Sequence, residues 1–276
     1  MLLSSSKLQA QTNWSETLKA VASDRAGEDF FGRSVSIDGN YAIVGAFLED
    51  EDASGQNTKS RAGSSYLFER DTATGNWSEV QKIVASDRTN SDSFGWSVSI
   101  SGNYAIVGAS SEDEDANGQN TKNSAGSAYL FERNTTTGTW SEVQKIVASD
   151  RDNRDFFGWS VSINGNYAIV GASGENEDAS GLNPLDEAVW AYIFVRGANG
   201  NWSEVQKIVA SDRTNSDSFG WSVSISGNYA IVGASSEDED ANGQNTKNSA
   251  GSAYLFERNT TTGTWSEVQK IVASDR

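Results

Sequence analysis

Four short acidic tracts carry the residues in this chain that are best suited to hold a metal ion. In one tract, side-chain oxygens stand at every second position, on Asp113, Asp115 and Asn117, and Gly118 follows. An EF-hand-type calcium loop begins in this way, because alternate side chains converge on the cation and the glycine allows a sharp turn. The candidate ligands in the other tracts are Asp50, Asp52 and Ser54, then Asp178 and Ser180, and finally Asp238, Asp240 and Asn242.

Two hypotheses for these tracts stay open. None of them supplies the bidentate glutamate that completes an EF-hand, and the ninth position counted from Asp113 is Thr121. Calcium would therefore bind in the weak class, with a dissociation constant on the order of 10⁻⁴–10⁻³ M. The competing hypothesis is a solvated acidic loop that keeps the surface of the protein soluble.

The composition argues against an enzyme. The chain has no cysteine and no histidine, which removes thiol nucleophiles, the commonest general base and the commonest zinc ligand. Paired aspartates such as Asp87 and Asp92 do occur, but the same pair recurs along the chain, whereas an active site needs one asymmetric constellation. We interpret these pairs as turn caps and salt-bridge partners, and the protein as non-enzymatic.

These features recur because the chain is built from a repeat of about 63 residues. The tryptophan of a Trp-Ser-Glu signature stands at Trp14, Trp77, Trp140, Trp202 and Trp265. Residues 75–151 and 200–276 are identical. A fixed period of this length is typical of an array of supersecondary units that share a core.

Each repeat reads as four antiparallel strands. In the second copy, residues 97–100 alternate polar and apolar side chains, a Gly-Asn turn follows, and residues 104–109 are continuously apolar. Beyond the acidic tract, residues 127–132 and 140–147 form two further strand patterns, and no segment has a helix pattern.

Four-stranded units in tandem predict an all-β array of β-propeller-type blades. We expect an N-terminal tail over 1–12, blades over 13–75, 76–138, 139–200 and 201–263, and a surplus strand over 264–276. The four blades either close into a ring or form an incomplete propeller, and we favour the open arc. An open edge strand would then allow self-association.

The residues also resemble a known family. Phe94-Gly95 followed by Gly108-Ala109 is similar to the FG-GAP repeat of integrin-type β-propellers. The signature returns at Phe31-Gly32 with Gly45-Ala46, Phe157-Gly158 with Gly171-Ala172, and Phe219-Gly220 with Gly233-Ala234. The resemblance implies a propeller and a binding or adhesion module outside the cell or on its surface.

This chain departs from the family pattern in two respects. No proline follows Ala109, and the only proline of the chain is Pro184. Integrin-like blades carry a calcium loop between their first two strands, whereas residues 101–103 are too short for one. The family's metal site is therefore not expected at that position.

The acidity restricts the partners. The formal net charge is −17, and the four tracts hold 15 of the 38 acidic residues. Such a surface repels nucleic-acid phosphates and anionic lipid, and no apolar run approaches the roughly 18 residues of a membrane span. The N-terminal apolar run is too short for a signal peptide.

We therefore expect a protein or glycan ligand. Trp190, which has no counterpart in the other copies, is the candidate for a specific contact. The alternative hypothesis is a purely structural segment of a larger cell-surface protein, with no ligand of its own.

Overall fold

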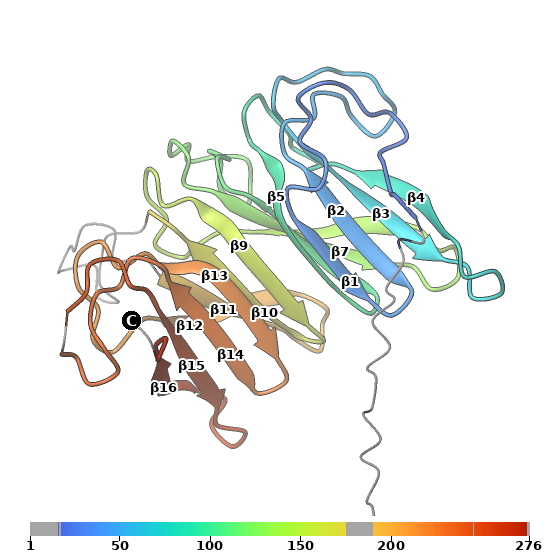
Figure 1. Ribbon diagram of the computed structural model, residues 1–276. Coiled ribbons are helices and arrows are strands. Elements are labelled where there is room, and N and C mark those ends of the chain that lie inside the picture. Colours follow the sequence, from blue (N-terminus) through green and yellow to red (C-terminus); the bar gives the residue numbers. More distant parts are fainter. Residues whose placement is uncertain (1–15, 17, 175–189, 245, 275–276) are drawn as a thin grey trace, which may run out of the picture.

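The computed structural model describes residues 16, 18–174, 190–244 and 246–274, and these contain sixteen strands and no helix. The strands form four separate sheets, which we call blades 1 to 4 (Figure 1). The first strands of the blades are β1 (Val35–Asp38), β5 (Phe94–Ser101), β9 (Phe157–Asn164) and β13 (Phe219–Ser226). The second strands are β2 (Tyr41–Ala46), β6 (Tyr104–Ala109), β10 (Tyr167–Ala172) and β14 (Tyr229–Ala234).

The third and fourth strands complete each blade. The third strands are β3 (Ser64–Arg70), β7 (Ser127–Arg133), β11 (Trp190–Arg196) and β15 (Ser252–Arg258). The fourth strands are β4 (Trp77–Ile83), β8 (Trp140–Ile146), β12 (Trp202–Ile208) and β16 (Trp265–Ile271). Within each blade, every strand pairs antiparallel with the next one in the chain, so each blade is a meander. The predicted all-β array of four four-stranded blades is confirmed.

The grouping of strands into blades differs from the expected boundaries. Blades 2 to 4 begin at their Phe-Gly pairs, and blade 1 begins at the equivalent strand β1, which starts at Val35. Every blade ends at its Trp strand, and in blade 4 this is β16, with Trp265 opposite Arg258. The strand at Trp265 is therefore not a surplus strand. A repeat fixes the period of an array but not the point at which each unit starts, and here the start is set by hairpin pairing. Trp14 lies outside the described residues.

The Phe-Gly signature makes a bulge that brings neighbouring blades close together. In blade 2, Phe94 pairs with Ala109 while Ser97 pairs with Gly108, and Gly95 between them has a φ of 90°. A Cβ placed on Gly45 of blade 1 would lie only 2.0 Å from the carbonyl oxygen of Gly95. Glycine is therefore required where the two backbones meet.

Each blade has two different faces. We call the face toward the next blade in the chain its leading face, and the face toward the previous blade its trailing face. The leading face of blade 2 has Ile106, Leu130 and Ile146, which pack in one buried cluster with Val161 and Ile163 on the trailing face of blade 3. The hydrophobic core therefore lies between the blades.

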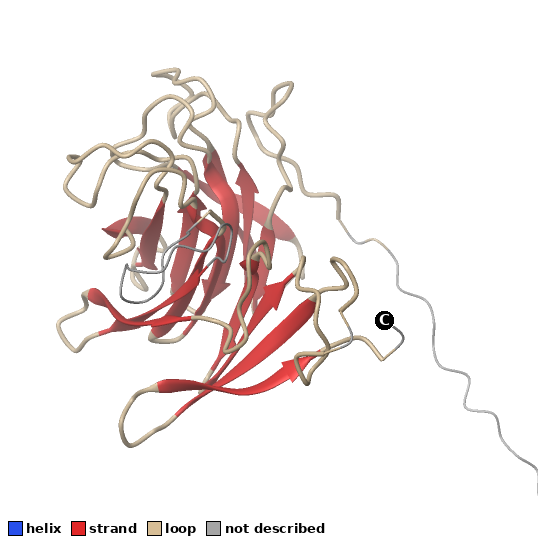
Figure 2. Ribbon diagram, turned by 90° about the vertical axis from the view of Figure 1, so that its left-hand side faces the viewer, coloured by secondary structure: helices blue, strands red, loops and turns tan. Residues whose placement is uncertain are grey.

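The array is an open arc. The first strands contact one another, β1 with β5, β5 with β9 and β9 with β13, so they lie on the inner side. The four sheets diverge outward from this side like a fan (Figure 2). Blades 1 and 4 stand at opposite ends, and the four sheets do not close into a ring among the described residues.

Candidate functional site

The acidic tracts form loops between the second and third strands of the blades, as their position in the repeat predicts. In blade 1, one carboxylate closes the tip of the loop. Asp52 accepts hydrogen bonds from the backbone N–H of Ser54 at 2.8 Å, from that of Gln56 at 3.0 Å and from the side-chain amide of Asn57 at 2.5 Å. Hydrogen bonds from Ser54 and Asn57 hold the pKa of Asp52 far below its usual range.

The other aspartate of each loop braces its base. The Asp50 carboxylate accepts the backbone N–H of Arg61 at 2.6 Å, and that of Asp113 accepts the N–H of Ser124 at 2.7 Å. Asp115 and Asp240 close the tips of the loops in blades 2 and 4, because they accept the backbone N–H of Asn117 and Asn242. Asp238 braces the base of the blade 4 loop by accepting the backbone N–H of Ser249. Asp178 and Ser180 lie outside the described residues. Calcium binding by these side chains stays a prediction.

An arginine from the following linker clamps each of the first two acidic loops. The guanidinium of Arg88 donates to the carbonyl oxygens of Asn57 and Asp50, both at 2.8 Å. Arg151 makes the same pair of contacts with Asn120 at 2.7 Å and Asp113 at 2.6 Å. The Ala-Ser-Asp-Arg segments that end at Arg88 and Arg151 therefore hold the acidic loops of blades 1 and 2 to the linkers that lead into the next blades.

The aspartate of that segment belongs to a buried ionic cluster. In blade 1, Lys82 lies 2.7 Å from Asp24 and 3.3 Å from Glu49, and the Tyr66 hydroxyl donates to Asp24 at 2.7 Å. Burial raises the pKa of Asp24, but the hydrogen bonds from Lys82 and Tyr66 outweigh it and the net shift is downward. Blades 2 and 4 repeat the cluster around Lys145 and Lys270.

These clusters also hold the carboxylates that lie closest together. Carboxylate oxygens of Asp24, Glu49 and Glu51 lie within 4.8 Å of one another, as do those of Asp212, Glu237 and Glu239. In both groups a lysine ammonium already pairs with two of the three carboxylates. This arrangement suits an internal ion-pair network.

The second aspartate of each predicted pair caps a turn. Asp92 accepts hydrogen bonds from both the backbone N–H and the hydroxyl of Thr89, three residues earlier. Burial raises the pKa of Asp92 above its usual value. The interpretation of the aspartate pairs as turn caps and salt-bridge partners is confirmed.

Trp190 lies in the core and not on the surface. It begins β11, its side chain is 1% exposed, and it belongs to the cluster between blades 2 and 3. The Lys207 ammonium stands 4.0 Å from its ring centroid and the Arg213 guanidinium 5.1 Å. Two cations and the core cover this ring, so it offers no surface to a ligand.

A different set of aromatic residues is partly exposed on the inner side of the arc. Trp96, Trp159 and Trp221 occupy the same bulge position in β5, β9 and β13, and their ring centroids are 4.6 Å and 4.9 Å apart. Phe47 extends the row by contacting Trp96 at 4.9 Å. We call these four residues the aromatic row. The regular spacing of its tryptophans is visible in the sequence, but their partial exposure is not.

None of the described residues forms a helix long and apolar enough to cross a membrane.

Among solved structures, a crystal structure of a protein from Lactobacillus plantarum is similar, with 15% identity and a TM-score of 0.46. The match covers 84% of this chain and 65% of that one, so the chain spans about two thirds of the length of this solved protein. No curated protein matches the chain.

The family comparison agrees with the repeat seen in the structure. The model of the FG-GAP repeat matches residues 14–68, 77–131, 140–184 and 202–256. The matched segments contain the Phe-Gly bulges and the Gly-Ala strand ends at which neighbouring blades meet. The chain therefore belongs to the FG-GAP repeat family.

Proposed function

We propose that the protein is a non-enzymatic binding module that acts outside the cell and holds a neutral glycan along the aromatic row. The observation that carries this proposal is the row itself. Trp96 and Trp159 are partly exposed and Trp221 is 48% exposed, although large aromatic side chains of this size are usually buried. The tryptophans come from blades 2 to 4 and Phe47 from blade 1, so all four blades contribute to one apolar strip.

The surroundings of the row favour an uncharged ligand. Phe47 is the first residue of an acidic loop, and the Arg33 guanidinium lies over the Trp96 ring at 4.3 Å. This end of the row therefore carries a guanidinium that can donate hydrogen bonds to sugar hydroxyls. The net charge of −17 repels polyanionic ligands. Weak calcium binding by the acidic loops is part of the same proposal, because a cation would reduce the repulsion between loops that flank one ligand.

The family membership supports binding rather than catalysis, but a fold by itself does not confer a function. The carboxylate clusters of the described residues are repeated in blades 1, 2 and 4 and paired with lysine, whereas an active site needs one asymmetric constellation.

The proposal is tested by tryptophan fluorescence during titration with a panel of neutral oligosaccharides. We expect Trp159→Ala and Trp221→Ala to lose the response, and Val205→Ala, an exposed residue on β12, to retain it. Saturable binding that survives both tryptophan substitutions would contradict the assignment of the row. If the fluorescence responds to extended peptides and to no glycan, the ligand is a protein segment and the glycan proposal is wrong. If it responds to neither, the purely structural alternative is favoured.

A further inference from the structure

The two ends of the arc expose faces that are buried everywhere else. Blade 4 repeats the sequence of blade 2, because residues 75–151 and 200–276 are identical. On the leading face of blade 2, Ile146 is 3% exposed, whereas the equivalent Ile271 of blade 4 is 39% exposed. Tyr229 at the edge of the same face is 57% exposed. The residues are the same, and only the neighbouring blade differs.

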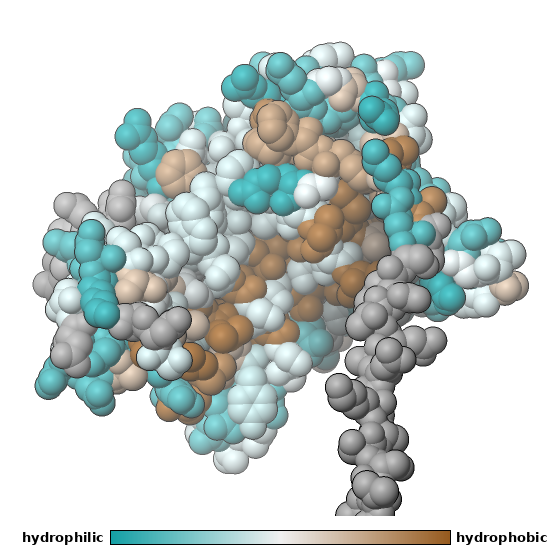
Figure 3. All heavy atoms as spheres, viewed as in Figure 1, coloured by the Kyte–Doolittle hydropathy of each residue, from teal (hydrophilic) through white to brown (hydrophobic). Residues whose placement is uncertain are grey.

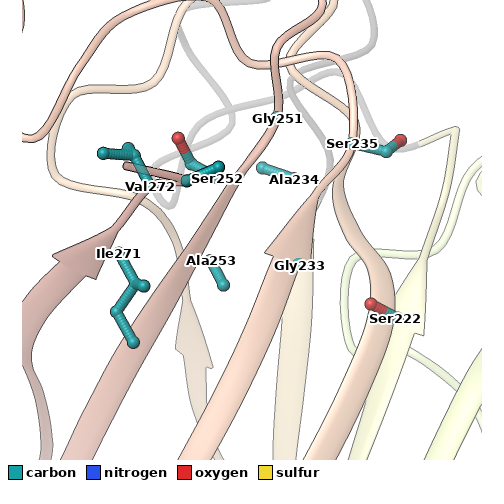
Figure 4. Close-up of a pocket in the computed structure, with 10 residues that line it drawn as sticks. Ser222, Gly233, Ala234, Ser235, Gly251, Ser252, Ala253, Ile271 and Val272 are labelled. Atoms are coloured by element: carbon teal, nitrogen blue, oxygen red, sulfur yellow. The ribbon is translucent and has the colours of Figure 1, made fainter. Parts of the chain in front are cut away.

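The leading face of blade 4 contains a hollow of about 490 Å³ (Figure 4). It is lined by small residues, among them Ser222, Gly233 and Gly251. At the three interfaces within the chain, the corresponding positions receive the Phe-Gly backbone of the next blade. A Cβ on Gly126 would lie 2.1 Å from the carbonyl oxygen of Phe157, and one on Gly108 would lie 2.0 Å from that of Gly158.

No other blade fills this hollow within the described residues. The nearest atoms to a Cβ on Gly233 all belong to Ser222 of the same blade. In blades 2 and 3 the equivalent serines, Ser97 and Ser160, donate to the carbonyl oxygens of Gly158 and Gly220 in the next blade. The hollow therefore has the shape and the donor expected for a Phe-Gly segment.

The opposite end of the arc presents that segment on an uncovered apolar face. Val35 and Ile37 on the trailing face of blade 1 are each 66% exposed, whereas the equivalent Val98 and Ile100 of blade 2 are 5% and 4% exposed. Apolar side chains gather over β1 and β2 at this end and over β14 and β15 at the other (Figure 3). The linker ahead of blade 1 lies where the linker ahead of blade 2 does, because Ala22 is buried against blade 1 as the equivalent Ala85 is buried ahead of blade 2.

The polar groups of the two ends also match the pairs made inside the arc. Within the chain, Arg133 lies over the Tyr41 ring of the previous blade at 4.7 Å and pairs with Glu69 at 3.6 Å. The serine Ser36 accepts the backbone N–H of Ile100 at 3.1 Å. At the ends, blade 4 offers Tyr229, Glu257 and Ser224, and blade 1 offers the complementary Arg70 and the N–H of Ile37.

We propose that the leading face of blade 4 binds the trailing face of blade 1 of a second copy of this chain, head to tail. The Phe31-Gly32 backbone of the second copy enters the hollow, and Arg70 packs on Tyr229. The junction repeats the backbone and apolar contacts of the three interfaces already present in the chain. It differs at the aromatic row, where Trp221 meets Arg33 of the second copy, whereas two of the interfaces within the chain pair tryptophans.

The interface is heterologous, since a different face of each copy takes part, and this gives a sharp test. Tyr229→Lys places a cation opposite Arg70 and blocks the leading face, while Ile37→Lys blocks the trailing face. We expect the unchanged chain to exceed its monomer mass of 29.6 kDa as concentration rises in sedimentation equilibrium. Each variant alone should remain monomeric, and an equimolar mixture of the two should form a heterodimer through the one intact pair of faces.

Val143→Lys, a substitution at an exposed position on β8, is the control and should associate as the unchanged chain does. Near-ultraviolet circular dichroism is used to check that each variant is folded. Gly233→Val fills the hollow and is therefore a second variant that blocks the leading face. A chain that stays monomeric at all concentrations would overturn the proposal. Association that persists in both single variants, or a mixture that stays monomeric, would overturn it as well.

Discussion

The side-chain amide of Gln81 in blade 1 makes two hydrogen bonds with the backbone of Trp140 in blade 2. It donates to the carbonyl oxygen and accepts from the N–H, each at 2.8 Å. Gln144 bonds to Trp202 and Gln206 to Trp265 in the same way. The outer strands of neighbouring blades are therefore joined by an amide pair, although they belong to different sheets.

This pairing predicts unequal effects for two identical substitutions. Gln144→Leu removes both hydrogen bonds and leaves the backbone groups of Trp202 unpaired, so it should lower the free energy of unfolding by about 1–3 kcal/mol. Gln269→Leu changes an exposed residue in the identical sequence of blade 4 and should have little effect. Urea unfolding at low protein concentration measures both, and equal effects would contradict the role of the amide pair.

A second prediction concerns the buried lysines. Lys145 pairs with Asp87 at 2.8 Å and with Glu112, whose side chain is 1% exposed. Lys145→Met leaves these carboxylates without their cation and should cost about 3–5 kcal/mol. Lys122→Met, which removes an exposed pair with Asp152, should cost at most about 1 kcal/mol in the same unfolding experiment. A small loss at Lys145 would mean that the cluster does not depend on its charge.

The pH dependence of stability carries the third prediction. A side-chain hydrogen bond with Glu112, together with burial, raises the pKa of Glu114 to about 7 from its usual 4.5. The folded state then holds a proton that the unfolded chain releases, so this contribution is complete below about pH 4.5 and is lost as the pH rises through about 7.

Glu114→Gln should flatten the fall in stability between these two pH values. Asp71→Asn provides the opposite case, because hydrogen bonds from the backbone of Thr74 and Ala73 lower the pKa of Asp71. That contribution is present above the unfolded pKa and is lost as the pH falls, so this variant should change only the acid side of the profile. If the stability of Glu114→Gln falls as steeply between about pH 4.5 and 7 as that of the unchanged chain, the raised pKa of Glu114 is refuted.

The fourth prediction concerns calcium. Isothermal titration should show binding with a dissociation constant on the order of 10⁻⁴–10⁻³ M. Asp115→Asn should weaken it, because Asp115 is a candidate ligand at a loop tip. Asp71→Asn, at a hairpin turn outside the acidic loops, should leave it unchanged. Absence of heat and of any shift in melting temperature would establish the alternative, a solvated acidic loop.

Much of the architecture was accessible from the sequence because it depends on local periodicity. The expected strand over 104–109 coincides with β6, and that over 127–132 differs from β7 by one residue. Turn glycines such as Gly102, with a φ of 56°, mark the hairpins directly. The blade boundaries were less accessible, because the Trp strand is equally compatible with opening or closing a sheet.

The candidate site was harder to predict because its contacts join distant parts of the chain. Lys145 meets Asp87 and Tyr129 only after the linker folds against β7 and β8, across 58 and 16 residues of sequence. The lysine and the tyrosine equivalent to Lys145 and Tyr129 recur in every repeat, and this recurrence is a signal for such a cluster. The sequence pattern around each residue does not show that the two side chains come together. The uniqueness of Trp190 likewise gave no information about its burial, which depends on the cluster between blades 2 and 3 and on Lys207 and Arg213.

The linkers have a consequence for how this protein is made. Ser86 and Asp87 bind Glu142, Tyr129 and Lys145 of the blade that follows, and Arg88 binds the loop of the blade before it. Every partner of such a linker has thus emerged from the ribosome by the time its own blade is complete. The chain can therefore fold in the direction of synthesis, adding one blade at a time to a finished surface, without waiting for its C-terminus.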